Sequence, residues 1–162
     1  MLRIITLVIA MFLVMPAFAV SKVDVGDKVK VKYIGRLKDG RVFDHNIGRK
    51  DLIFTIGSGS MIKAFEDAFI GMKKGDMKTF MIPAKNAYGE FDVNKLFRVP
   101  IDQMPSNTKV GDVLRYNLGG GAYPVRVVEV EEEEAYIDAN HKLAGKDLSF
   151  EIELIDFKSP NS

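Results

Sequence analysis

The chain contains no cysteine, only two histidines, and no large excess of charge of either sign. Without cysteine it can form neither a disulfide nor a lipid-modified cysteine anchor, so its stability must come from packing. Without a cluster of histidine or cysteine, we expect no structural zinc site. Its 23 Lys and Arg residues are balanced by 22 Asp and Glu residues. Because a nucleic-acid-binding surface needs a basic stripe, we expect no nucleic-acid partner.

Long apolar runs are equally scarce, and the one that stands out lies at the N-terminus. A single positive charge, Arg3, precedes an apolar run over residues 4–14, and Ala17-Phe18-Ala19 follows. This pattern predicts a secretory signal peptide over residues 1–19, cleaved after Ala19. The run is shorter than the ~20 residues that span a bilayer, and an uncleaved membrane anchor is the alternative. We therefore expect an exported protein, periplasmic or secreted, which is a monomer without membrane attachment once the signal is removed.

Several stretches of the remaining chain have the pattern of strands. Apolar residues alternate with polar ones over residues 29–33 and again over residues 148–154. Alternation with a period of two predicts strands that have one face toward water. Shorter strands are expected at residues 52–56 and 77–82, and Asp39-Gly40 is typical of a hairpin turn.

One helix is expected between these strands. Glu66 and Asp67 fall on one side of it, opposite an apolar set with helical spacing that consists of Ile62, Phe65, Phe69 and Met72. Gly71 or Gly75 is expected to end this helix. Several strands together with a single short helix indicate an α+β fold.

The segment over residues 93–139 differs in character from its surroundings. It carries short β-like runs at residues 113–118, 123–130 and 135–137 and is too long for a plain loop. We interpret it as an inserted small β domain whose two ends lie close together. The main domain then consists of residues 20–92 and 140–158, followed by a short tail over residues 159–162.

Other motifs are weak indications of function. The acidic run Glu131–Glu134 predicts a solvated hairpin tip rather than a metal or cation site, because adjacent carboxylates repel unless water screens them. Gly57-Ser58-Gly59 lacks the Lys-Ser/Thr ending of a phosphate loop and predicts a close backbone turn. A hydrolase would need His45 with Asp44 and a serine such as Ser58 or Ser60, but no nucleophile elbow accompanies them. We interpret His141 as a hydrogen-bonded hinge residue.

Taken together, several motifs resemble the FKBP-type peptidyl-prolyl isomerases in order and spacing. The position of the insert and its return through Asn140-His141-x-Leu143-Ala144-Gly145 resemble the SlyD branch of that family. The motifs of the main domain are Tyr33, Asp39-Gly40, Phe43-Asp44, Phe54-x-Ile56-Gly57, Met61-Ile62, Gly71-Met72-x-x-Gly75, Ala87-Tyr88-Gly89 and Leu148-x-Phe150.

The resemblance implies a twisted antiparallel sheet packed on one short helix, and cis/trans isomerisation of X–Pro bonds without a cofactor or metal. It also implies a proline pocket walled by Tyr33, Phe43 and Phe150, lined by Met61 and Ile62, and floored by Phe65. The Ile62 N–H and the Tyr88 hydroxyl would donate hydrogen bonds to substrate carbonyls, and Asp44 would orient the rim.

Two positions depart from the family pattern: Phe65 stands where many members carry Trp, and Leu52 where an aromatic wall residue often lies. The His- and Cys-rich tail typical of the SlyD branch is missing, so no nickel-handling role is expected. The expected partners are proline-containing and unfolded polypeptides, and the insert is expected to hold the unfolded ones. The alternative is a non-enzymatic periplasmic holdase. The client-binding residues would be Leu96, Phe97, Val99, Ile101, Met104, Leu118, Tyr123 and Val125, unless these simply form the insert's own core.

Overall fold

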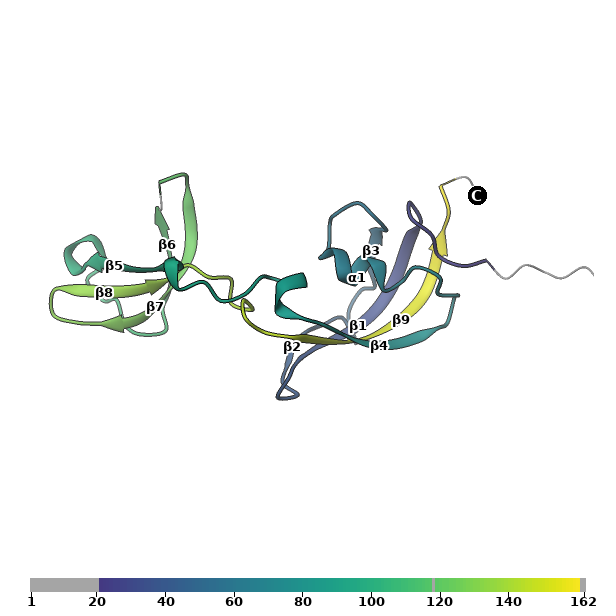
Figure 1. Ribbon diagram of the computed structural model, residues 1–162, viewed down its shortest axis with the longest axis horizontal. Coiled ribbons are helices and arrows are strands. Elements are labelled where there is room, and N and C mark those ends of the chain that lie inside the picture. The colour runs from purple at the N-terminus through teal and green to yellow at the C-terminus, as the bar shows by residue number, and fades with distance from the viewer. Residues whose placement is uncertain (1–20, 118, 161–162) are drawn as a thin grey trace, which may run out of the picture.

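The computed structural model describes residues 21–117 and 119–160, which form two lobes joined by a narrow connection (Figure 1). The main lobe contains residues 21–92 and 140–160, and the small lobe contains residues 93–139. The expected signal peptide and Leu118 lie outside the described residues. Within the described part of the chain, no helix is long and apolar enough to cross a membrane.

The main lobe is built on an antiparallel sheet whose centre is the long strand β1. Strand β1 pairs along its whole length with β9, and β9 pairs with β4. The other edge of β1 is shared, because β3 pairs with residues 28–31 and β2 with residues 34–36. The bounds are β1 Lys28–Leu37, β2 Val42–His45, β3 Leu52–Thr55, β4 Met77–Ile82 and β9 Leu148–Lys158. The strands predicted from alternation are thus confirmed, and Asp39-Gly40 makes the β1–β2 turn, with Gly40 at φ 85°.

The one α-helix found in residues 21–117 and 119–160 lies on one face of this sheet (Figure 1) and is shorter than predicted. Helix α1 spans only Lys63–Asp67. Beyond it the chain continues as tight turns, since the amides of Phe69 and Ile70 donate to carbonyls three residues earlier. Gly71, at φ 81°, then ends the segment. These turns keep Phe69 and Met72 directed into the core, which explains why the sequence had the apolar pattern of a longer helix.

The core of the main lobe lies between α1 and the sheet. The α+β prediction is confirmed, because buried apolar side chains of β1, β3, β4 and β9 pack against the helix and the turns that follow it, with Phe43 of β2 partly buried beside them. The fully buried set includes Val29, Val31, Ile56, Phe69, Ile82, Leu148 and Leu154. Helix α1 carries no side-chain cap at its N-terminus, so packing, rather than capping, holds this short helix in place.

The small lobe is a second antiparallel sheet in the strand order β5-β8-β7-β6. Its strands are β5 Leu96–Pro100, β6 Val113–Asn117, β7 Ala122–Val130 and β8 Glu134–Asp138. It also contains two short 3-10 helices, η2 Val93–Lys95 and η3 Ile101–Gln103, and a third, η1 Ala84–Asn86, lies in the main lobe before the connection. Strand β5 was not predicted as a strand. It is only five residues long and ends at a proline, which an edge strand tolerates because its outer N–H groups need no partner.

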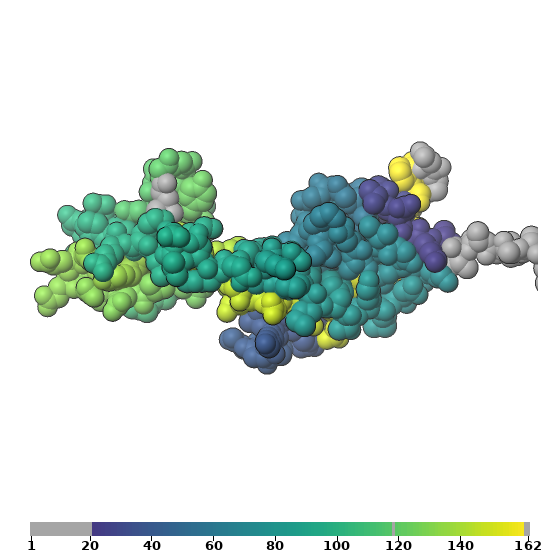
Figure 2. All heavy atoms as spheres, in the orientation of Figure 1, coloured from purple at the N-terminus to yellow at the C-terminus, as the bar shows by residue number. Residues whose placement is uncertain are grey.

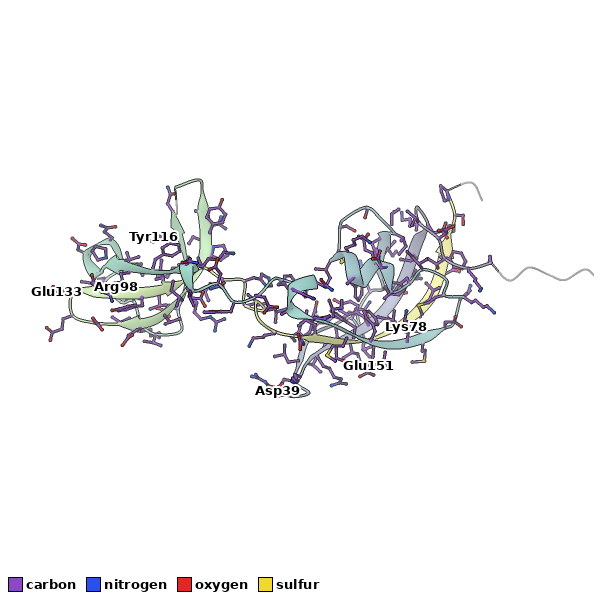
Figure 3. All side chains as sticks on the ribbon, in the orientation of Figure 1. Asp39, Lys78, Arg98, Tyr116, Glu133 and Glu151 are labelled. Carbon is purple, nitrogen blue, oxygen red and sulfur yellow. The ribbon has the colours of Figure 1, made fainter. Side chains whose placement is uncertain are left out.

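A second hydrophobic core, separate from that of the main lobe, lies inside the small lobe. It consists of Val99, Met104, Val125, Val127, Ala135 and Ile137. At the far tip, the Glu131 amide donates to the Glu134 carbonyl at 2.8 Å and closes the β7–β8 hairpin. Figure 3 labels Glu133 there, pointing outward at the end of the molecule furthest from the main lobe. The acidic run is therefore a solvated hairpin tip.

Two chain segments, residues 88–92 and 140–145, connect the lobes and are called the neck. Figure 2 shows that the molecule is narrowest there. The Asp92 amide donates to the Asn140 side chain at 3.0 Å, and the Asn140 amide group donates back to the Asp92 carbonyl at 2.9 Å. On the small-lobe side, the Ala139 amide donates to the Lys95 carbonyl at 2.9 Å. The two ends of the small lobe thus lie side by side.

Candidate functional site

A hollow of about 360 Å³ opens on the main lobe beside α1. All eight residues predicted for the proline pocket line it, and two others complete it. The lining is Tyr33, Phe43, Asp44, Leu52, Ser60, Met61, Ile62, Phe65, Tyr88 and Phe150. These residues come from β1, β2, β3, the loop before α1, α1 itself, the neck and β9. The fold thus brings together residues that are far apart in the chain.

Aromatic rings form the floor and one wall of the hollow. Phe65 is only 4 % exposed and meets the edges of two other rings, with centroid distances of 5.8 Å to Tyr33 and 5.0 Å to Phe150. Phe43 stands nearly perpendicular to Phe150 at 5.7 Å. Edge-to-face contacts of this kind are favourable beyond the area that they bury. Phe150 therefore belongs both to the core and to the hollow.

The Phe43 ring can lie against the sheet only because residue 35 is a glycine. A Cβ atom added at Gly35 would come within 2.6 Å of the Phe43 Cζ atom. Gly35 is paired with Asp44 on β2 and with Phe150 on β9. A glycine inside a strand often marks a close approach of this kind. Gly35 thus sets the position of one wall. It lies in β1, two residues beyond the strand predicted over residues 29–33, and it was not singled out from the sequence.

Few polar groups reach the hollow. The Tyr33 hydroxyl donates to Asp44 Oδ2 at 2.7 Å, which fixes the rim between β1 and β2. In the described part of the chain, no hydrogen bond is formed by the Ile62 N–H or by the Tyr88 hydroxyl. Tyr88 is 42 % exposed, as expected of a residue at a rim. These two donors are available to a ligand.

A buried carboxylate holds the loop that carries Met61 and Ile62. Glu66 is 2 % exposed, and its two oxygens accept from the Gly57 amide at 2.7 Å and the Met61 amide at 3.1 Å. The prediction that Glu66 lies on the outer side of the helix is therefore wrong. The loop over residues 57–61 folds back over the N-terminal end of α1 and covers this side chain. Nothing in the sequence distinguishes Glu66 from its exposed neighbour Asp67.

Two other hollows on the described residues have a different chemistry. One, of about 560 Å³, is lined by Leu37, Lys38, Asp39, Arg41, Gly145, Lys146 and Asp147. The other, of about 220 Å³, is lined by Lys28, Val29, Lys30, Ile53, Asp156, Phe157 and Lys158. Lysine and aspartate side chains line both of these hollows, whereas the floor of the aromatic hollow is the ring of Phe65. Among the residues that the structure describes, no group of three or more His, Cys, Asp or Glu side chains could hold a metal ion.

Comparison with known proteins agrees with this geometry. Residues 20–116 match the family model of the FKBP-type peptidyl-prolyl cis-trans isomerases. The chain belongs to this family. It is 33% identical over 129 residues to the isomerase SlyD of Yersinia pestis, covering 78% of this chain and 66% of that protein. It is 31% identical over 151 residues to a short-type isomerase of Methanocaldococcus jannaschii, covering 85% and 95%.

The resemblance seen in the sequence is thus confirmed at the level of the FKBP family and its fold. The chain spans 66% of the length of the SlyD protein from Yersinia pestis. The two departures from the family pattern, Phe65 and Leu52, both line the hollow. The catalytic roles of the eight pocket residues stay predictions.

The eight residues predicted to bind clients fall into four groups in the structure. Leu96 and Tyr123 are exposed, whereas Phe97 and Ile101 are half-buried. Leu118 lies outside the described residues. The other three, Val99, Met104 and Val125, are buried in the core of the small lobe and offer no surface to a client in this conformation.

The residues of the hydrolase alternative are not joined into a catalytic arrangement. The hydroxyls of Ser58 and Ser60 lie 2.9 Å apart and bond to each other. Asp44 is occupied by the Tyr33 hydroxyl and by the His45 backbone amide. Among the described residues, no hydrogen bond joins the His45 ring to either serine. This arrangement does not activate a serine.

Tyr33 is expected to titrate at a pH well above the ordinary value for a tyrosine in this FKBP-type chain. Burial, then the hydrogen bond to Asp44, and then the charge of that carboxylate raise the pKa of Tyr33 to about 12. The neutral phenol is favoured in the folded state. Its contribution to stability is therefore complete below pH ~10 and is lost as the pH rises toward 12.

Ultraviolet absorbance of tyrosinate against pH measures this titration. Tyr33→Phe should remove the step near pH 12, and Asp44→Asn should move that step down without returning it to the ordinary value, because burial is the larger cause. A step near pH 12 that survives in Tyr33→Phe would contradict the assignment.

Proposed function

We propose that this chain is an exported prolyl isomerase that rotates X–Pro bonds in the aromatic hollow, and that its small lobe holds unfolded clients. The observation that carries the proposal is that one hollow with an aromatic floor is lined by all eight pocket residues. Its volume lies at the small end of the range of about 300–1,000 Å³ that is usual for ligand sites. It therefore suits a prolyl ring with its flanking backbone rather than a large ligand.

The chemistry needs no acid, base or nucleophile. Rotation about the C–N bond of a peptide has a barrier of about 18–20 kcal/mol because resonance stiffens that bond. The cis and trans X–Pro states differ by only about 0.5–1 kcal/mol, so the reaction needs a lower barrier rather than a driving force. The twisted transition state has lost this resonance and much of its dipole. An apolar floor of Phe65, Tyr33 and Phe150 favours it over the planar and more polar amide.

The two available donors would orient the substrate. The N–H of Ile62 stands just before α1, and the hydroxyl of Tyr88 stands at the neck side of the hollow. Hydrogen bonds from these two sides to carbonyls that flank the proline would hold the chain while the imide bond turns between them. Glu66 supports the first donor by bonding to the Met61 amide, 3.1 Å from its Oε1 atom.

The small lobe is proposed as the client-holding part. Several apolar side chains on it are exposed, among them Val110, Val113 and Tyr123. Weak capture of an unfolded segment there would raise the local concentration of prolyl bonds near the hollow. Export is proposed from the charge, apolar run and Ala17-Phe18-Ala19 at the start of the sequence.

The test is a prolyl-exchange assay on a short peptide. Phe43→Ala removes a wall and Tyr88→Phe removes only a hydroxyl, and each is expected to lower kcat/KM about tenfold, because a lost contact or donor loosens the substrate. The matched control is Tyr136→Phe, which removes a hydroxyl from β8 in the small lobe and should have no effect on this assay.

The result also separates the two candidate functions. A chain that suppresses the aggregation of unfolded proteins without accelerating exchange would be a holdase on an FKBP scaffold. Normal exchange rates in both Phe43→Ala and Tyr88→Phe would contradict the placement of the reaction in this hollow.

A further inference from the structure

An aromatic stack links the neck to the hollow. The rings of Tyr88 and His141 lie nearly parallel, 11° apart, with centroids separated by 3.9 Å. Tyr88 follows η1 on the chain segment that leaves the main lobe. His141 lies on the segment that returns to it after β8. The stack therefore joins the returning segment to the residue that offers a free hydroxyl at the rim.

The backbone around the stack is held on both sides. The Gly145 amide donates to the Gly89 carbonyl at 2.8 Å, and Asp92 and Asn140 exchange the two hydrogen bonds described above. These contacts fix the two neck segments relative to each other. The side chain of Tyr88 itself has no hydrogen bond among the described residues. Stacking on the His141 ring is therefore the contact that restrains the Tyr88 ring.

The His141 ring is held in one orientation by a backbone hydrogen bond. Its Nδ1 atom accepts a hydrogen bond from the Leu143 amide at 3.2 Å, so that nitrogen carries no proton. Burial, and then the charge of Lys142, lower the pKa of His141 below its ordinary value. The groups that act on the ring are thus Lys142 beside it in the chain and the phenol of Tyr88 stacked on it. Of these two groups, Lys142 disfavours a charged imidazole.

We propose that His141 is a positioning residue for the isomerase reaction: its ring holds the Tyr88 ring at the rim of the hollow, within reach of a bound chain. This inference rests on the proposed function of Tyr88 as a donor. A flat aromatic partner fixes the plane of the phenol, which the single bonds of an exposed tyrosine would otherwise leave free to rotate. His141 touches no substrate in this role and acts only through Tyr88.

The kinetic test compares two replacements in the full chain. His141→Asn keeps a polar side chain without a ring face and should lower kcat/KM for a short peptide about five- to tenfold, because the donor loses its alignment. His141→Phe keeps the ring and should stay within about threefold of the original chain. Equal losses in the two variants would overturn the proposal.

A double-mutant cycle distinguishes positioning from general stability. In a Tyr88→Phe background there is no hydroxyl left to position, so adding His141→Asn should change kcat/KM by less than about twofold. Losses that multiply independently would overturn the proposal, since His141 would then act on something other than Tyr88.

A spectroscopic measurement decides the point even if the chain is not an isomerase. The NMR signals of the Tyr88 ring, identified by their loss in Tyr88→Phe, should shift as His141 titrates below pH ~6.5. His141→Phe should abolish this titration, and Lys142→Ala should move its midpoint upward because a nearby cation is gone. If catalysis is absent but the titration is present, the proposed function fails while the stack stands. Tyr88 ring signals that do not shift as His141 titrates would overturn this inference.

Discussion

Replacing Glu66 by Ala is expected to lower the free energy of unfolding by about 2–3 kcal/mol, although the residue is charged and lies on a surface helix. The change removes an acceptor that is 2 % exposed and that serves the Gly57 and Met61 amides. Hydrogen bonds to a charged group contribute more than those between neutral groups. Denaturant unfolding of the two proteins measures the difference.

The same substitution should also slow prolyl exchange about five- to tenfold, because the loop that carries Met61 and Ile62 loses its attachment to α1. The matched control is Asp67→Ala. Asp67 is the next residue on the same helix but is exposed, and it pairs only with Lys63. An exposed pair of this kind contributes about 0.3–0.5 kcal/mol, so little change is expected.

Glu66→Gln refines the experiment. The amide oxygen can replace one carboxylate oxygen as an acceptor, but its NH₂ group would face a second N–H donor. Stability should therefore fall between the values for the original chain and Glu66→Ala. Equal stabilities for Glu66→Ala and Asp67→Ala would show that the buried carboxylate does not hold the loop.

Much of the main lobe could be predicted from local pattern alone. The alternation over residues 29–33 and 148–154 follows directly from a sheet with one covered face, and β1 and β9 carry it. The helix was overestimated because turns with hydrogen bonds three residues apart keep apolar side chains on the same side as α-helical turns do. Strand β5 was missed because five residues that end in proline give little pattern.

The site was predictable only in part, and for a physical reason. The residues that line the hollow were identified by resemblance, since no periodicity brings Tyr33, Tyr88 and Phe150 together. Glu66, Gly35 and the Tyr88–His141 stack depend on contacts across the fold. A buried glutamate and an exposed aspartate are equivalent in local sequence, and only the returning loop over residues 57–61 makes them different.

Each of the two lobes has its own hydrophobic core. The main core and the small core share no residue, and the hydrogen bonds of the neck, such as that between Ala139 and Lys95, place the two connecting segments side by side. The hollow is lined entirely by the main lobe and the neck. The small lobe should therefore be removable without opening the hollow or uncovering the main core.

Deleting residues 95–138, with a short glycine link between Asn94 and Ala139, is expected to leave kcat/KM for a short peptide within about threefold of the original value. Catalysis of the refolding of a protein limited by proline isomerisation should fall about 10- to 100-fold, because the deletion removes the site that would hold the client near the hollow. Both activities are measured on the same preparation of the deletion variant, and thermal unfolding of that variant shows whether its main lobe is folded.

A surface variant separates loss of the lobe from loss of its apolar face. Leu96→Ser with Tyr123→Ser changes two exposed side chains and leaves the core of Val99, Val125 and Ile137 intact. It should reproduce part of the loss in protein refolding while peptide exchange is unchanged. If the deletion left protein refolding unaffected, client binding by the small lobe would be excluded. If it abolished peptide exchange in a folded main lobe, catalysis would depend on more than the hollow.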